Sequence, residues 1–415
     1  MEDVDPLTDF VAPPIFCPVI SVDDHVLEPS DMFSSRVPKR FADRMPLLEE
    51  GDDGFPYWVI DDRRIGITIT NGAVGRPRHE WAGDSLHRYE EFREGVWNST
   101  KRLVDMDLAG IWAQVCFPSA IWGFSGREFS QMKDEEAGLV ALRAYNDWVI
   151  DEWCGPHRDR YVPCQVAWLR DPVVAAEEVR RNAERGFRAV HFNENPEVLD
   201  FPSLYENSWD PFFEACQETE TVINLHVGSS GSTIRPSRLS PHETVSALFP
   251  LSGVISVVNW IHARIPVRFP EIKVALSEAG ATWVPMVAER LKRSYRGLEV
   301  TKIWGPDDPS PDEFLHRNFW FCSIEDPVAF TLLGDVIDPK HLMIEIDYPH
   351  TDSTWPYCQD VLRAEMSDLP RHTIEDICFR NAATLYRHVE PPAEWIEQVV
   401  AASNVASPGD TAVVV

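Results

Sequence analysis

The sequence predicts a (β/α)8 barrel, a closed ring of eight parallel strands that are each followed by a helix. The chain has 415 residues, a length that fits one barrel with insertions. Eight short apolar runs, rich in β-branched and aromatic residues, recur along it as buried parallel strands require. Most of these runs are followed by a helical pattern, and this alternation is typical of parallel sheets. An open, doubly wound sheet has the same alternation and is the alternative.

The predicted elements follow in chain order. We expect strands at Pro18–Val22, Trp112–Pro118, Val162–Leu169, Phe187–Phe192, Thr221–His226, Lys273–Ser277, Phe319–Ile324 and Leu342–Asp347. We expect helices between them, at Asp134–Glu152, Pro172–Arg185, Asp210–Glu218 and Ala281–Arg296 among others.

A single domain is expected over residues 1–402, with two insertions. The first, at about 28–98, is rich in Pro, Gly, Arg and Trp and is expected to cap the barrel mouth. The second, at about 228–250, begins GSSGST and is interpreted as a mobile active-site loop. The tail, residues 403–415, is expected to be frayed.

The composition excludes several classes of partner. Acidic residues number 67 and basic residues 38, so a net charge of -29 should repel nucleic acid and anionic membranes. The sequence contains no apolar run of about 18 residues and no signal peptide, so we expect no membrane span. Its eight cysteines form no CxxC pair, which argues against a zinc ribbon and favours reduced thiols in the cytoplasm. A homo-oligomer is compatible with these features.

Polar residues interrupt the apolar runs where several of the predicted strands end. These are Asp23 and His25 on strand one, His191 and Glu194 on strand four, His226 on strand five, Glu278 after strand six, and Glu345, Asp347 and His350 on and after strand eight. Asp23 and His25 are two residues apart, so both face the same side of their strand. Barrel enzymes carry their catalytic groups at these strand ends.

Each of these residues also has a structural interpretation. A lone histidine is more often a hydrogen-bonded structural residue, and a lone aspartate before a turn is more often a helix N-cap. The joint pattern favours a site, because five strands would bring carboxylates or imidazoles to one mouth. Bare carboxylates at such a place would repel one another and lose hydration, and a metal ion removes that conflict.

The motifs ISVDDHVLEP, AYNDW, NENP, NLHVGSSG, LSEAGATWVP and EIDYPHTDSTWP resemble the amidohydrolase superfamily through most of the chain. They resemble in particular its branch that contains aminocarboxymuconate-semialdehyde decarboxylase and related metal-dependent hydrolases. The resemblance implies a metal held by Asp23, His25, His226 and Asp347.

Two departures from the decarboxylase pattern lead to a different expectation. The first strand offers Asp-x-His in place of His-x-His, and Glu278 stands where decarboxylases carry a histidine acid/base. In dinuclear relatives, strands four and six supply further ligands, roles that fit Glu194 and Glu278. The resulting four carboxylates and two imidazoles would neutralise two divalent ions and would suit iron or manganese better than zinc. In a hydrolase or lyase, a metal-bound water would attack a carbonyl, with Asp347 or Glu278 as the catalytic base.

The full motif set is similar to that of the barrel-fold nonheme di-iron monooxygenase group of platensimycin and platencin biosynthesis. That resemblance implies two Fe ions, O2 and an external reductant or electron donor, and hydroxylation of a bulky diterpenoid acyl-CoA. Arg235 and Arg238 are the candidates for binding the CoA phosphates, and His191, Glu345 and His350 would support the ligands. The alternatives are a metal-dependent hydrolase or decarboxylase, with Mn or Zn, and a metal-binding scaffold without activity.

Overall fold

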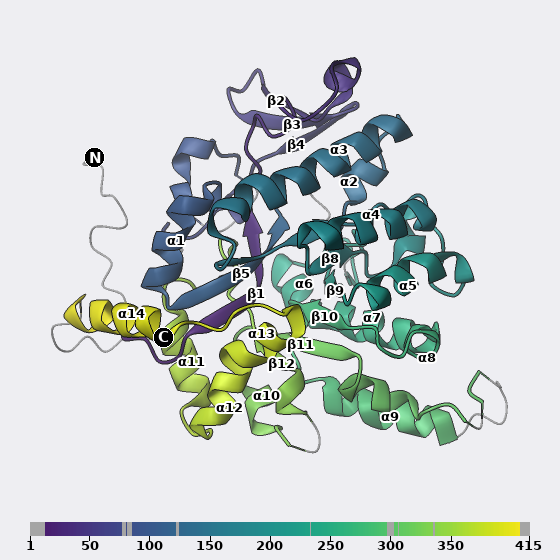
Figure 1. Cartoon of the computed structure of the whole chain (residues 1–415), viewed down its shortest axis with the longest axis vertical. Helices are drawn as coiled ribbons and strands as arrows, with labels where there is room; N and C mark the ends of the chain where they lie inside the picture. Colours follow the sequence, from purple (N-terminus) through teal and green to yellow (C-terminus); the bar gives the residue numbers. More distant parts are fainter. Residues whose placement is uncertain are drawn as a thin grey trace.

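Eight parallel strands form the barrel of the computed structural model, which describes residues 13–76, 80, 85–121, 124–232, 234–296, 303–305, 307–334 and 337–406 (Figure 1). The strands are β1 (Val19–Val26), β5 (Ile111–Pro118), β6 (Tyr161–Val162), β7 (Cys164–Val166), β8 (Ala189–Phe192), β9 (Val222–His226), β10 (Val274–Ser277), β11 (Phe319–Ser323) and β12 (Leu342–Ile344). β6 and β7 are halves of one strand on either side of Pro163, which has no amide hydrogen to donate to the sheet.

Two continuous sheets make up this ring, in the orders β1-β5-β6 and β7 through β12. Backbone hydrogen bonds join the segment that follows the last strand to the first strand. The Asp347 amide donates to the Asp23 carbonyl at 2.9 Å, and the His25 amide donates to the Tyr348 carbonyl at 2.6 Å. Every residue of the barrel strands is buried except the half-buried Trp320, as the apolar runs predict.

All eight predicted strands are present, but three of them end three or four residues away from the predicted position. The first strand continues to Val26, four residues past the predicted end, and the third ends at Val166, three residues before it. β12 ends at Ile344, so Glu345 and Asp347 follow the strand instead of belonging to it. Further along, Asp347 has a left-handed backbone with φ of 55°.

The helices cover the outside of the barrel. They are α1 (Ser99–Leu108), α2 (Arg127–Ser130), α3 (Glu135–Trp148), α4 (Pro172–Arg185), α5 (Asp210–Glu218), α6 (His242–Leu248), α7 (Pro250–His262), α8 (Ile265–Arg268), α9 (Val284–Arg296), α10 (Pro327–Thr331), α11 (Cys358–Met366), α12 (Arg371–Glu375), α13 (Asn381–Tyr386) and α14 (Ala393–Ala406). α4 shows how local sequence sets its limits. The Asp171 side chain accepts from the amides of Val173 and Val174, Pro172 begins the helix, and Gly186 ends it at φ 107°.

The first insertion contains a small antiparallel sheet of β2 (Leu47–Glu50), β3 (Pro56–Ile60) and β4 (Arg63–Gly66), drawn above the barrel in Figure 1. Its later part reaches the strand ends, where the Ala73 amide donates to the Pro349 carbonyl at 2.8 Å. The second insertion is less irregular than predicted, because its final third folds into α6 and α7 begins at Pro250.

The C-terminal segment is helical further than predicted. α14 extends to Ala406, and the Ser403 hydroxyl accepts the Ile15 amide at 3.3 Å, so residues 403–406 are helical and not frayed. The remaining residues of the predicted tail, 407–415, lie outside the described part of the chain.

One helical stretch, Glu243–His262, is long and apolar enough by length and composition alone to cross a membrane. A single stretch of this kind is weak evidence, because the core helices of globular proteins meet the same criteria.

Arg102 is a buried cation that connects the first two strands of the barrel. Its guanidinium donates to the Gln114 side chain at 3.0 Å and to the His25 carbonyl at 2.7 Å, and it lies 3.9 Å from the centre of the Tyr348 ring. The side chain is fully buried, so water could not take the place of the guanidinium as a hydrogen-bond donor to these acceptors.

We therefore expect Arg102→Met to lower the free energy of unfolding by about 3 kcal/mol or more, because it leaves several buried acceptors unpaired. Urea unfolding followed by fluorescence measures the change. The control is Arg180→Met on α4, which removes an exposed ion pair with Glu218 and should cost about 1 kcal/mol or less. Equal losses in the two variants would contradict the structural role of Arg102.

Candidate metal centre

Asp23 and His25 lie side by side at the end of β1. They are two residues apart on an extended strand, and the His25 Nε2 atom is 3.3 Å from Asp23 Oδ1. Asp24, between them, points elsewhere and accepts the Tyr348 amide at 3.0 Å. All three side chains are fully buried.

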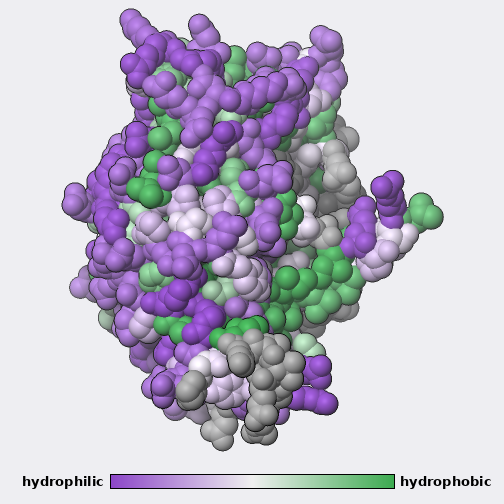
Figure 2. All heavy atoms as spheres, turned by 90° about the vertical axis from the view of Figure 1, so that its right-hand side faces the viewer, coloured by the Kyte–Doolittle hydropathy of each residue, from purple (hydrophilic) through white to green (hydrophobic). Residues whose placement is uncertain are grey.

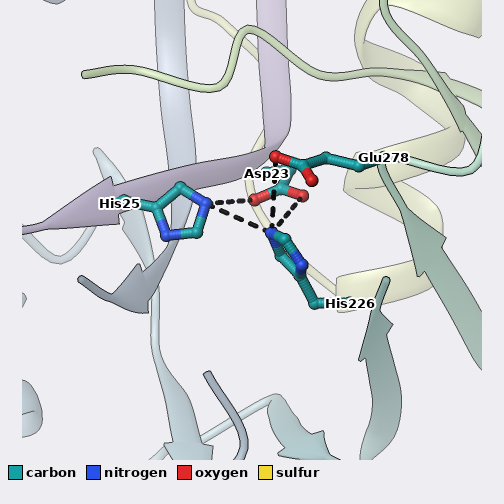
Figure 3. Close-up of side chains that lie close together, drawn as sticks. All are labelled: Asp23, His25, His226 and Glu278. Atoms are coloured by element: carbon teal, nitrogen blue, oxygen red, sulfur yellow. Dashed lines mark hydrogen bonds and ion pairs between the residues drawn. The ribbon is translucent and has the colours of Figure 1, made fainter. Parts of the chain in front are cut away.

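Three further strand ends bring their side chains to this pair. The His226 Nε2 atom lies 3.3 Å from His25 Nε2 and 3.5 Å from Asp23 Oδ2. The Glu278 carboxylate is 3.6 Å from His226 Nε2, and Asp347 Oδ1 is 3.3 Å from His25 Nε2. Figure 3 shows four of these side chains, Asp23, His25, His226 and Glu278, pointing toward one another.

The backbone is strained at two of these residues. Glu278 and Asp347 both have φ of 55°, a left-handed conformation that non-glycine residues seldom adopt. Hydrogen bonds hold each of them: the Glu278 amide donates to Glu345 at 3.0 Å, and the Asp347 amide donates to the Asp23 carbonyl. Strain of this kind is often found at functional sites.

Burial sets the electrostatics of the cluster. Loss of hydration raises the pKa of the Asp23, Glu278 and Asp347 carboxyls well above their usual range, and repulsion among the neighbouring carboxylates adds to the rise. Burial likewise lowers the pKa of His25 well below its usual range, and that of His226 to about 4. Both imidazoles are therefore neutral near pH 7, the form that binds metals.

The cluster fits a metal ion. Neither oxygen of Asp23 or Asp347 has a hydrogen-bond partner within the described residues, although both side chains are buried. Two sets of side chains could hold an ion, and within each set the ligand atoms all lie within 4.8 Å of one another. The first set is Asp23, His25, His226 and Glu278, and the second is His25, Glu278, Asp347 and His350. A divalent cation would neutralise this charge, and mixed carboxylate and imidazole ligands suit Mn, Fe or Zn.

Glu194 belongs to neither of these sets of ligand atoms, so its predicted role as a bridging ligand stays a prediction. Its Oε1 atom accepts from the Gly228 amide at 3.1 Å and from the Ser230 hydroxyl at 2.7 Å. Its Oε2 atom accepts from the Ser256 hydroxyl at 3.2 Å. The carboxylate therefore anchors the loop after β9 to α7.

The three predicted supporting residues occupy different places. His350 is the nearest, with Nδ1 3.0 Å from Asp347 Oδ1, and its ring stacks on His25 with centroids 3.7 Å apart. Glu345 is buried beneath the cluster and accepts the Glu278 amide. His191 lies against Phe117, with its Nε2 atom 3.1 Å from the Cys116 carbonyl oxygen, and it belongs to neither set of ligand atoms.

A cavity of about 390 Å³ opens beside the cluster, within the usual size range of small-ligand sites. Its lining includes Thr70, Asn71, Ser119, Phe124, Arg127, His226, Gly228, Gly231, Phe249, Glu278, Asp347, His350 and Asp352. The predicted phosphate-binding residues Arg235 and Arg238 are exposed and do not line it. Sequence reasoning missed Arg127, whose only signal is its position in the turn that follows the second barrel strand.

An eight-stranded barrel with carboxylates and imidazoles at its strand ends is an architecture that many barrel enzymes share, and its cluster could hold a metal ion. The chain belongs to the amidohydrolase family, whose characteristic sequence it matches over residues 79–388. The predicted superfamily is thus confirmed.

Solved structures share the fold. An amidohydrolase from Mycobacterium avium subsp. paratuberculosis is 23% identical with a TM-score of 0.66, over 90% of this chain and 100% of that one. A 5-carboxyvanillate decarboxylase from Sphingomonas paucimobilis is 18% identical with a TM-score of 0.62, over 90% and 100%. A dihydroxybenzoic acid decarboxylase from Polaromonas, which has bound manganese, is 14% identical with a TM-score of 0.60, over 90% and 97%.

These comparisons correct the predicted reaction class. The similar proteins are decarboxylases and amidohydrolases, which are lyases and hydrolases, so the prediction of an oxidoreductase is wrong. No finding supports the resemblance to a monooxygenase or a role for iron, O2 and a reductant, whereas the manganese alternative agrees with the similar structures. The ligand-count analogy failed because similar ligand sets serve different chemistries on different folds.

We expect the purified protein to bind one Mn²⁺ per chain, because the side chains of Asp23, His25, His226 and Asp347 converge on one compact site. Metal analysis after equilibrium dialysis measures the stoichiometry. Asp23→Asn should reduce the bound metal at least about tenfold, whereas Glu194→Gln should retain it. Two ions per chain, or loss of the metal in Glu194→Gln, would restore the dinuclear site.

Proposed function

We propose that the chain is a metal-dependent decarboxylase of a small organic acid. The single observation that carries the proposal is the cluster of buried, unpartnered carboxylate oxygens that borders a cavity of small-molecule size. The similar proteins support it, because several of them are decarboxylases of hydroxylated benzoic acids. The predicted CoA-linked substrate and electron donor stay untested, and the residues assigned to the CoA lie outside the cavity.

Asp23, His25, His226 and Asp347 are the residues we assign to the ion. These four residues lie at three strand ends. The two histidines supply neutral nitrogen donors, and the two aspartates supply anionic oxygen donors. A bound divalent ion supplies Lewis acidity, which polarises substrate oxygens and favours the negative charge that develops during the reaction.

Glu278 is the residue that we assign to proton transfer. It lines the cavity, its carboxylate lies 3.6 Å from His226 Nε2, and the Glu345 carboxylate fixes its backbone amide. In decarboxylation the bond between the carboxylate and its carbon breaks, CO2 leaves, and the electron pair stays on the carbon. That carbon takes a proton from Glu278, which then regains one from solvent. A carboxyl group thus takes the part that a histidine plays in the decarboxylase pattern.

His350 holds a fixed orientation beside this centre. Its Nδ1 atom lies 3.0 Å from Asp347 Oδ1 and its Nε2 atom lies 3.0 Å from the Ser119 hydroxyl, so both ring nitrogens are engaged. We assign to it the positioning of Asp347, whose carboxylate oxygens otherwise lack partners.

Hydrolysis is the second candidate, and the carboxylate at position 278 is the observation that favours it. A glutamate at the edge of a metal centre can serve as a general base toward water as well as a proton donor to carbon. The amidohydrolase among the similar structures supports this reading.

The isotope that enters the product separates the two reactions. The Mn²⁺-loaded protein is incubated with 2,6-dihydroxybenzoate, with 5-carboxyvanillate, and with phenyl acetate as a hydrolysable probe. Decarboxylation in D2O should release CO2 and place one deuterium on the product ring, with no oxygen taken from H2¹⁸O. Incorporation of ¹⁸O into acetate, without CO2 release from the acids, would replace the lyase with a hydrolase.

Glu278→Gln should lower kcat about 10²- to 10⁴-fold and leave the Mn²⁺ content unchanged, since the amide keeps the shape but cannot donate a carboxyl proton. Metal analysis and CO2 release on the same preparation provide the measurement. Glu218→Gln on α5 is the matched control and should keep most of the activity, because Glu218 pairs with Arg180 at the surface and does not line the cavity. If Glu278→Gln loses the metal, this residue is a ligand and the proton comes from elsewhere.

A further inference from the structure

We propose that Arg127 forms an anion-binding subsite in the cavity beside the metal centre, and that the substrate is a planar acid with a second anionic group. The inference rests on the proposed function, because it assigns the reacting carboxylate to the metal centre and the second anion to Arg127. It adds a residue of the chain to which neither the sequence motifs nor the ligand clusters point.

The turn that carries Arg127 is fixed against the barrel. Gly126 has φ of 80°, and a Cβ atom at this position would lie 2.2 Å from the Ala167 carbonyl oxygen, so only glycine fits. The short helix α2 starts at the next residue, and the Ser130 hydroxyl at its end accepts the Leu169 amide at 3.0 Å. Arg127 therefore projects from a rigid point next to the strand ends.

The guanidinium of Arg127 lies against the loop that follows β9. A Cβ atom on Gly231 would be 2.6 Å from Arg127 Nη1, so a side chain at position 231 would occupy the space of the guanidinium. Both residues line the cavity, together with Glu278 and Asp347 of the metal centre. Arg127 is about one-fifth exposed, which leaves it accessible to a bound molecule.

Charge around Arg127 is not balanced by its protein partner alone. Its Nε and Nη2 atoms lie 3.1 and 3.0 Å from Glu128 Oε1, while Arg63 of the capping sheet pairs with Glu128 Oε2. Glu128 is buried and its one carboxylate pairs with two guanidinium groups, so these three side chains together retain one positive charge, while Glu278, Asp347 and Asp352 also line the cavity. Among the described residues that line the cavity, Arg127 is the one lysine or arginine. An anion bound in the cavity would balance this charge and accept hydrogen bonds from the planar guanidinium of Arg127.

Two aromatic rings favour a flat substrate between the subsite and the metal centre. Phe124 and Phe249 both line the cavity. The Phe124 ring lies 4.2 Å from the His226 ring, centre to centre, so this wall adjoins the metal ligands directly. An aromatic or conjugated acid offers the flat apolar body that such walls accommodate.

Binding of two matched probes to the Mn²⁺-loaded protein tests the subsite. Isophthalate carries two carboxylates, whereas 3-carbamoylbenzoate replaces one of them with a neutral amide of the same shape. We expect calorimetry to show that Arg127→Gln weakens isophthalate binding about 10- to 100-fold and 3-carbamoylbenzoate binding less than about threefold. Arg63→Gln should also weaken isophthalate binding, because the Glu128 carboxylate would then pair only with Arg127 and would neutralise its charge. The control Arg180→Gln on α4 should change neither.

Two results would overturn the subsite. One is equal affinity of the wild-type protein for the two probes, which would mean that no second anion is recognised. The other is an equal loss of affinity for both probes in Arg127→Gln while the Mn²⁺ content is retained, which would mean that Arg127 has a structural role only. A wild-type protein that binds no Mn²⁺ would instead contradict the proposed function, so metal analysis of each sample separates the two failures.

Discussion

Buried negative charge at the barrel mouth is the constraint on which the rest of the site depends. Asp23 and Asp347 are almost completely removed from solvent, their carboxylate oxygens lack hydrogen-bond partners among the described residues, and Glu278 lies close by. Burying even one uncompensated carboxylate costs several kcal/mol, and neighbouring like charges increase that cost. The arrangement is stable only when the acids are protonated or a cation is bound. The two neutral imidazoles supply the additional donors that a metal ion uses.

The fold brings these groups together through its closure. The backbone hydrogen bond that joins the segment after the last strand to the first strand also places Asp347 beside Asp23. Glu345 holds the amide of Glu278 in its strained conformation, and His350 holds the carboxylate of Asp347. The site therefore depends on backbone geometry at the strand ends. The large outer face in Figure 2, by contrast, is mostly hydrophilic, as the net charge of the chain leads one to expect.

The sequence predicted the strands and five of the converging side chains well, because buried parallel strands have a recognisable apolar pattern and strand ends meet at one mouth. It did not foresee the partners of Glu194, because a carboxylate at a strand end can also turn toward the next loop and accept its amides. It did not point to Arg127, because the neighbouring Gly126 lies so close to the Ala167 carbonyl that no side chain fits there, and this packing is not visible in the sequence. The predicted reaction class was wrong because the number and type of metal ligands do not determine which reaction the site catalyses.

Diffraction at the manganese absorption edge, from crystals grown with Mn²⁺, tests the central claim most directly. The account predicts one anomalous peak, bounded by Asp23, His25, His226 and Asp347, with Glu194 still hydrogen-bonded to the loop after β9. Two peaks, with Glu194 turned inward to bridge them, would contradict the single-ion centre. The absence of any peak among these side chains would contradict the metal-dependent reaction itself.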